Sequence, residues 1–126
     1  MIEDAIRTIL VNAATPAASR IALDMMPEQT ALPYVRIDQI GGAVLLAHDG
    51  PAGHRKFNFQ VSAFASTGAG SRALIQACRT ALHMFSGTVG GDVIQAIYAQ
   101  SEPRVFYERQ SSVYSASMDF TAGYVA

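Results

Sequence analysis

Two segments of apolar–polar alternation constrain this fold more than any other feature of the chain. The first runs from Lys56 to Ala65 and carries an apolar side chain at every second position from Phe57 onward. The second runs from about Val113 to Val125 and alternates aromatic, alanine and methionine residues with serine, aspartate and threonine. Because successive side chains of a strand point to opposite faces, both segments are predicted strands. The second, roughly 40 Å long at ~3.4 Å per residue, is expected to twist strongly or to project beyond its own domain.

Two other segments have the three- and four-residue apolar spacing of amphipathic helices. The first runs from Ile2 to about Ala13 and ends at Thr15-Pro16. The second runs from about Ser71 to Phe85, with Gly87 as its expected C-terminal stop. Shorter extended segments are predicted at 20–23, 34–40 (closed by Gly41-Gly42), 93–99 and 104–108, with a flexible link at 66–70 and a turn at 88–91.

The order of these elements is helix, strands, helix, strands. It predicts a single α+β domain over residues 1–126, with an antiparallel or mixed sheet of four to five strands and two helices packed on one face. The other face of the sheet is expected to be semi-polar, since serine, glutamine and threonine recur there. Phe64 interrupts the polar positions, so this face is predicted to be partly covered.

Residues 43–53 are predicted to form a long loop between two strands. The segment begins with the apolar run Ala43–Ala47 and continues with His48–Gly53, which is rich in turn-forming residues. Ten or more residues are many for a hairpin connection, and long ordered loops tend to carry function. An apolar loop base is better explained by contact with a neighbouring molecule than by exposure to water.

Charged residues make up 15% of the chain, against about 25% in an average globular protein. Charge is depleted at the cores of protein interfaces, so this composition favours a subunit of a larger assembly. The net charge of −1 and the scattered basic residues argue against a nucleic-acid-binding protein, which needs a positive face. We expect neither a signal peptide nor a membrane helix, and we expect the chain to be made and assembled in a cytoplasm.

No set of residues in the sequence forms a convincing catalytic or metal site. His48, Asp49 and His54 are too few and too loosely placed for a metal, and Cys78 falls on the apolar stripe of its predicted helix. His83 is expected at the boundary of that stripe. The helix start at 68–71 lacks the lysine and the glycine spacing of a phosphate loop. The sequence therefore predicts a protein without enzymatic activity, cofactor or metal.

The order of the elements, together with four local motifs, resembles the tail completion, or tail terminator, proteins of long-tailed bacteriophages and gene-transfer particles. The motifs are the strand start Leu32–Ile37, the strand Phe57–Ala65, the alanine-rich helix around Ala77–Leu82, and the part Tyr114–Phe120 of the final strand, with its Asp119-Phe120 pair. The resemblance covers nearly the whole chain. Two departures from the pattern are the alanine-rich start of the loop at Ala43 and the lack of tryptophan in the last strand.

The resemblance implies a structural virion protein of the tail or neck, assembled in the host bacterial cytoplasm. Such proteins form a hexameric ring at the head-proximal end of the tail tube, stop tube polymerisation and join the tail to the head connector. The implied partners are further copies of the chain, the tail tube protein and the connector. DNA would pass through the ring, and a near-neutral protein suits such a channel.

We expect the contacts with other subunits or with the tube to come from the loop and the final strand. The residues we single out are Val44, Leu45, Leu46, His54, Arg55, Lys56, Tyr114 and Asp119. Two alternatives stay open: a head-closure or adaptor protein at the same neck, and a small-molecule-binding or enzymatic α+β domain with its site on the semi-polar sheet face.

Overall fold

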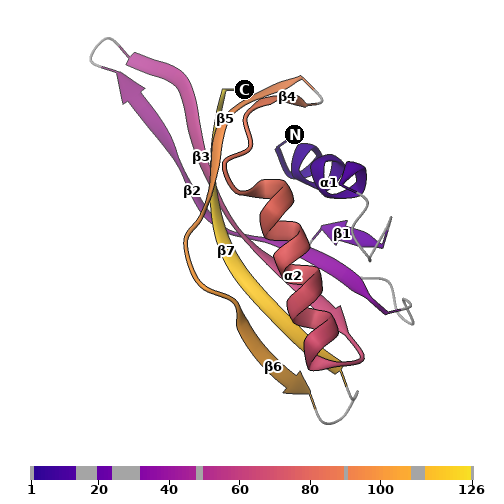
Figure 1. Ribbon diagram of the computed structural model, residues 1–126. Helices are drawn as coiled ribbons and strands as arrows, with labels where there is room; N and C mark the ends of the chain where they lie inside the picture. Colours follow the sequence, from indigo (N-terminus) through magenta and orange to yellow (C-terminus); the bar gives the residue numbers. More distant parts are fainter. Residues whose placement is uncertain are drawn as a thin grey trace.

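A computed structural model describes residues 2–13, 20–23, 32–47, 50–89, 91–108 and 113–125 (Figure 1). For residues 41–47, 50–55, 92, 108 and 125 only the backbone is described. The elements, in chain order, are α1 (Ile2–Asn12), β1 (Ile21–Leu23), β2 (Tyr34–Ala47), β3 (Gly50–Ala65), α2 (Gly68–Leu82), β4 (Gly87–Val89), β5 (Asp92–Ala99), β6 (Arg104–Glu108) and β7 (Val113–Val125).

The strands form one mixed sheet in the order β1-β2-β3-β7-β5-β4, with β6 also paired to β7. β1 runs parallel to β2, and every other pair is antiparallel. The α+β class agrees with the prediction, but the sheet formed by the described residues has seven strands instead of four to five. The short segment predicted at 20–23 is β1, whereas β4 was missed because it joins an edge through only three residue pairs, too few for a periodic pattern to be visible.

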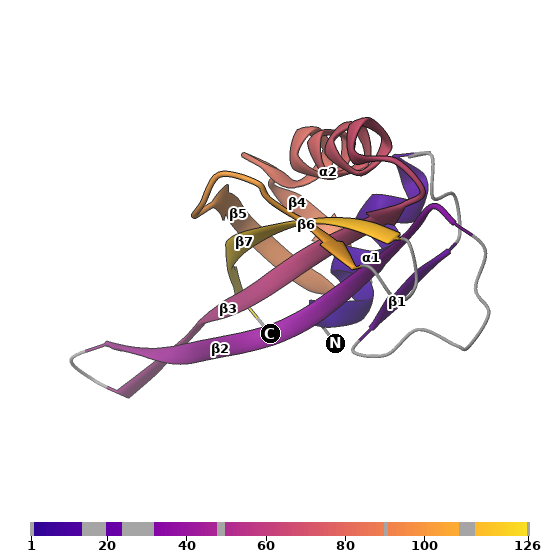
Figure 2. The same ribbon diagram turned by 90° about the horizontal axis from the view of Figure 1, so that it is seen from below.

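Both helices pack on one face of this curled sheet, as predicted (Figure 2). The alternating side chains of β3 and β7 line that face, and the rings of Phe59 and Phe120 stack at its centre with centroids 5.5 Å apart. Ile6 and Leu10 of α1, together with Leu74 of α2, complete the same core without exposure to solvent. We call this the inner face, and the opposite face of the sheet the outer face.

The start of α2 is fixed by a cap at Thr67, whose hydroxyl accepts a hydrogen bond from the Gly70 amide at 2.9 Å. The helix therefore begins at Gly68, inside the segment predicted to be a flexible link. It ends at Leu82, three residues before the predicted end. Met84 has a left-handed φ of 67° that no longer continues the helix, so Gly87 is not the helix stop but the first residue of β4. β4 also replaces much of the turn predicted at 88–91.

The prediction of a long loop over residues 43–53 is wrong. β2 continues to Ala47 and β3 begins at Gly50, and the two strands pair through Ala43↔Lys56, Val44↔Arg55 and Ala47↔Gly50. Two register shifts, between Gln39 and Gly41 and between Val44 and Leu46, interrupt the alternation by which a strand is recognised in a sequence. His48 and Asp49 lie outside the described residues.

This hairpin extends away from the helices, and we call residues 41–47 of β2 and 50–58 of β3 the arm (Figures 1 and 2). β7 accompanies β3 only as far as the pair His54↔Val125. Residues 50–53 therefore reach past the last residue pair between β3 and β7.

Candidate subunit interfaces

The outer face is polar along its centre, where two pairs of oppositely charged side chains lie within the chain. Arg36 Nε lies 2.9 Å from Asp38 Oδ2, and Arg104 Nη2 lies 3.2 Å from Asp119 Oδ1. Between these pairs, the buried hydroxyls of Ser62 and Ser117 are 3.2 Å apart and share a hydrogen bond. In the middle of the outer face these charges are therefore balanced within the chain.

An aromatic row crosses one end of the outer face. The rings of Tyr34 and Phe64 lie 4.7 Å apart, and the guanidinium of Arg36 sits 5.5 Å from the centre of the Phe64 ring. These contacts explain how Phe64 fits on a polar face, because neighbouring side chains of the same chain cover it. The row continues across Ser115 to Phe106, which is 60% exposed.

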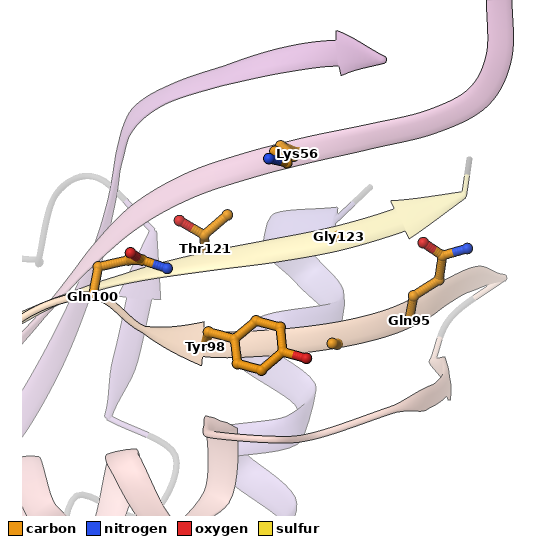
Figure 3. Close-up of a pocket in the computed structure, with 7 residues that line it drawn as sticks. Lys56, Gln95, Tyr98, Gln100, Thr121 and Gly123 are labelled. Carbon is orange, nitrogen blue, oxygen red and sulfur yellow. The ribbon is translucent and has the colours of Figure 1, made fainter. Parts of the chain in front are cut away.

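The outer face is hollowed near the root of the arm (Figure 3). The hollow has a volume of about 310 Å³ and opens over β3, β7 and β5. Its wall includes the exposed ring of Tyr98 and the amide side chains of Gln95 and Gln100, and Gly123 contributes no side chain to its floor. The other residues that line it are Lys56, Ala96 and Thr121. This open hollow has one charged lining side chain, that of Lys56, and its lining residues form no set of converging ionisable groups for catalysis.

A second hollow, of about 240 Å³, lies near the start of α2. It is lined by Leu32, Pro33, Ala65, Ser66, Thr67, Gly70 and Ala73, none of which carries an ionisable side chain.

The residues that the sequence singled out for interfaces fall in three places. Val44, Leu45 and Leu46 lie on the β2 strand of the arm, and His54 and Arg55 lie opposite on β3. For these five the structure describes the backbone only. Lys56 is exposed and lines the hollow at the root of the arm.

Tyr114 and Asp119 lie on β7, away from the arm, and both make contacts within the chain. The ring of Tyr114 lies 4.6 Å from that of Tyr107, and Asp119 pairs with Arg104. An interface role for the eight residues remains a prediction.

Several exposed apolar side chains that the sequence did not single out are better candidates for contacts. They are Ile40, Met84, Val93, Tyr98, Phe106 and Tyr107, all at least 45% exposed. One signal was available for the last two. Adjacent aromatic residues in a strand point to opposite faces, so a single core cannot bury both.

Cys78 and His83, which were weighed as possible catalytic residues, both have structural roles. Cys78 is fully buried, and burial raises the pKa of its thiol from 9.0 to about 12. His83 Nδ1 accepts a hydrogen bond from the Ala99 amide at 3.1 Å, which ties the end of α2 to β5. Within the described ranges, no three histidine, cysteine, aspartate or glutamate side chains come together as metal ligands. None of the described helices is long and apolar enough to cross a membrane.

Comparisons with known proteins agree with the sequence resemblance. A search of curated proteins finds no significant match. Among solved structures, a chain from "Virion of native gene transfer agent (GTA) particle" superposes with a TM-score of 0.75 at 13% identity, covering 99% of this chain and 95% of that one. A second solved structure, which carries no functional name, superposes with a TM-score of 0.63 at 17% identity, covering 99% and 94%. The sequence profile of the family "Tail completion protein gp17" matches residues 3–124, so the chain belongs to the tail completion protein gp17 family.

Proposed function

We propose that this protein is a structural component of a phage or gene-transfer-particle tail. It forms a closed, hexameric ring at the head-proximal end of the tail tube, where it ends tube polymerisation and joins the tail to the head connector. It works by assembly and not by catalysis, is built into the particle in the bacterial cytoplasm, and lets DNA pass without binding it specifically.

The observation that carries this proposal is the arm, on a chain whose family match spans residues 3–124. A ring subunit needs two different contact surfaces, one for each neighbour. The arm extends from one part of the sheet, and the exposed aromatic residues Phe106 and Tyr107 lie on another. The in-chain pairing of Arg36 with Asp38 and of Arg104 with Asp119 leaves few charges to be desolvated when such surfaces meet.

The two alternative functions have less support. A head-closure or adaptor protein at the same neck would also use ring contacts, and the position of the protein in the particle separates the two roles. A small-molecule-binding domain would need a deep pocket with converging polar groups. The hollow of about 310 Å³ beside Tyr98 is open, and its lining residues include one charged side chain, Lys56.

The test is to measure the mass of the purified protein by size-exclusion chromatography with light scattering, with and without its tail tube protein. We expect rings, visible by negative-stain electron microscopy, that cap one end of the tubes. Gold-labelled protein in whole particles should lie at the top of the tail, below the connector. A stable monomer at high concentration that forms no ring with tube protein would refute the proposal. Labelling above the tail, against the portal, would favour the adaptor role.

A further inference from the structure

We propose that neighbouring copies pair through their sheet edges, with the outer edge of β2 in one subunit adding to β6 of the next. We call residues 39–47 of β2 the open edge. This inference rests on the proposed ring and names the contact that closes it. Its partner is a second copy of this chain, joined by main-chain hydrogen bonds between strands.

The first observation is the sequence of the open edge. Residues 39–47 contain no charged residue and no proline. In the described part of the chain, β1 covers β2 only at Val35–Ile37, and no strand is paired to the open edge. Natural proteins protect long edge strands with charges, prolines or short lengths, because an unprotected edge pairs with other strands. The open edge has none of these three protections, and the register shifts at Gln39/Gly41 and Val44/Leu46 are its only irregularities among the described residues, so it is suited to a partner.

The second observation is that the same chain offers another edge that lacks a partner. β6 pairs with β7 on one side, and no described strand pairs with its other side. Phe106 is 60% exposed on the outer face and Tyr107 is 49% exposed on the inner face. A strand added to β6 would place side chains beside both aromatic residues, and this would bury apolar area on both faces at once.

These two edges lie on opposite sides of the sheet, and this placement determines how copies of the chain can associate. In the strand order, β2 and β6 are separated by β3 and β7. When the open edge of one copy adds to β6 of another, each end of the pair still presents an unused edge. Contacts of this head-to-tail type continue until they close in a ring or form a filament. A two-fold dimer through either edge alone would leave the other edge exposed.

The two edges are also offset along the strands. β6 pairs with residues 113–117 of β7. Residues 42–44 of the open edge pair with residues 55–57 of β3, which in turn pair with residues 122–124 of β7. Neighbouring subunits that pair in this way are shifted along the strand direction. A closed ring accommodates such a shift only if its strands are inclined to the ring axis, as they are by about 35–45° in closed barrels.

Disulfide cross-linking tests the pairing directly. One population carries a single added cysteine on the open edge (Gln39→Cys, Ala43→Cys or Leu46→Cys), and a second carries Phe106→Cys. We expect a cross-linked dimer in the mixed ring for at least one open-edge position, because paired strands bring Cα atoms within about 7 Å. Cys78 is fully buried, so it does not compete. Thr80→Cys, on the exposed side of α2, is the matched control and should give no cross-link to Phe106→Cys.

A charge test complements the cross-linking. The variant Gln39→Lys/Ala43→Lys places two lysines on the open edge, and the control Gln76→Lys/Ala73→Lys makes the same changes on exposed positions of α2. We expect the first variant to need at least about a tenfold higher concentration to form rings, and the control to behave as the wild type. Circular dichroism and thermal unfolding of both variants report whether each is folded.

The outcomes separate the inference from the proposed function. Rings that form normally in the open-edge lysine variant, with no cross-link to Phe106→Cys at any open-edge position, would overturn the edge pairing and leave the ring intact. Cross-links from the open edge to tube protein, or between two Phe106→Cys chains, would also overturn it. A wild type that forms no ring under any condition would refute the proposed function itself.

Discussion

At the residue scale, two glycines in the first turn of α2 have different surroundings. A Cβ at Gly70 would lie 2.8 Å from Thr67 Oγ1 and 3.3 Å from the Ala65 Cβ. A Cβ at Gly68 would make ordinary contacts with the ring of Tyr114, at 3.5 Å. The same substitution should therefore have opposite effects at two positions only two residues apart.

We predict that Gly70→Ala destabilises the protein by about 1–2 kcal/mol, because the new methyl group displaces the capping hydroxyl of Thr67. Gly68→Ala should be neutral or stabilising by up to about 1 kcal/mol, because alanine restricts the unfolded chain more than glycine does. Urea unfolding followed by circular dichroism measures both. Equal losses of stability in the two variants would show that the cap does not hold the start of the helix.

Cys78 gives the protein a distinct response to alkaline pH. Burial raises the pKa of its thiol to about 12, so the folded state keeps the proton where the unfolded chain loses it, above about pH 9. The contribution of the neutral thiol to stability is complete below pH 9 and falls as the pH rises toward 12.

We predict that between pH 8 and pH 10.5 the wild type loses about 2 kcal/mol more unfolding free energy than Cys78→Ala does. Tyrosine and lysine residues titrate in the same range, and the comparison with Cys78→Ala removes their contribution. Parallel stability curves for the two proteins across this range would contradict the assignment.

At the scale of the elements, the accuracy of the sequence predictions follows the regularity of each element. β7 has the predicted bounds, since its residues alternate from Tyr114 to Tyr124, and β6 has them as a short extended segment after Pro103. The start of α2 was placed three residues late because a glycine-rich first turn looks like a linker until its cap at Thr67 is recognised. The arm was taken for a loop because two register shifts and the pair Gly41-Gly42 remove the alternation of β2.

The arm should be separable from the rest of the fold. We predict that replacing residues 44–55 by Asn-Gly gives a folded monomer that forms no rings. Ala43 and Lys56 face each other across the hairpin, so a two-residue turn can join them. None of the described core residues lies in the deleted part. Thermal unfolding checks the fold, and light scattering with tube protein checks assembly.

A second variant tests whether assembly depends on the length of the arm or on its apolar side chains. It keeps the full length and carries Leu45→Thr and Leu46→Thr. If only the backbone of the open edge matters, this variant should still form rings. Rings formed by the shortened protein would show that the arm is not required for assembly.

At the scale of the whole molecule, composition indicated that the chain associates, but it could not indicate where. The eight residues chosen from the sequence lie on the arm and on β7, because they were selected from the predicted loop and the final strand. The pairing of Arg104 with Asp119 depends on strand register, which brings the two residues together across fifteen positions of the chain. The edges of β2 and β6 became candidates only when the order of the strands was known.

The central pairing of β3 with β7 also bears on when the molecule becomes able to assemble. Thr121 Oγ1 donates a hydrogen bond to Asn58 Oδ1 across 63 positions of the chain, and β7 supplies Ala116, Met118, Phe120 and Ala122 to the core. Pairings between distant segments form late and slowly, because a long loop must close first. In a nascent or truncated chain that lacks β7, the middle of β3 can pair only with β2, and β6 has no strand with which to pair. Incomplete chains would therefore be left out of the particle at the folding step, before any contact with a tail.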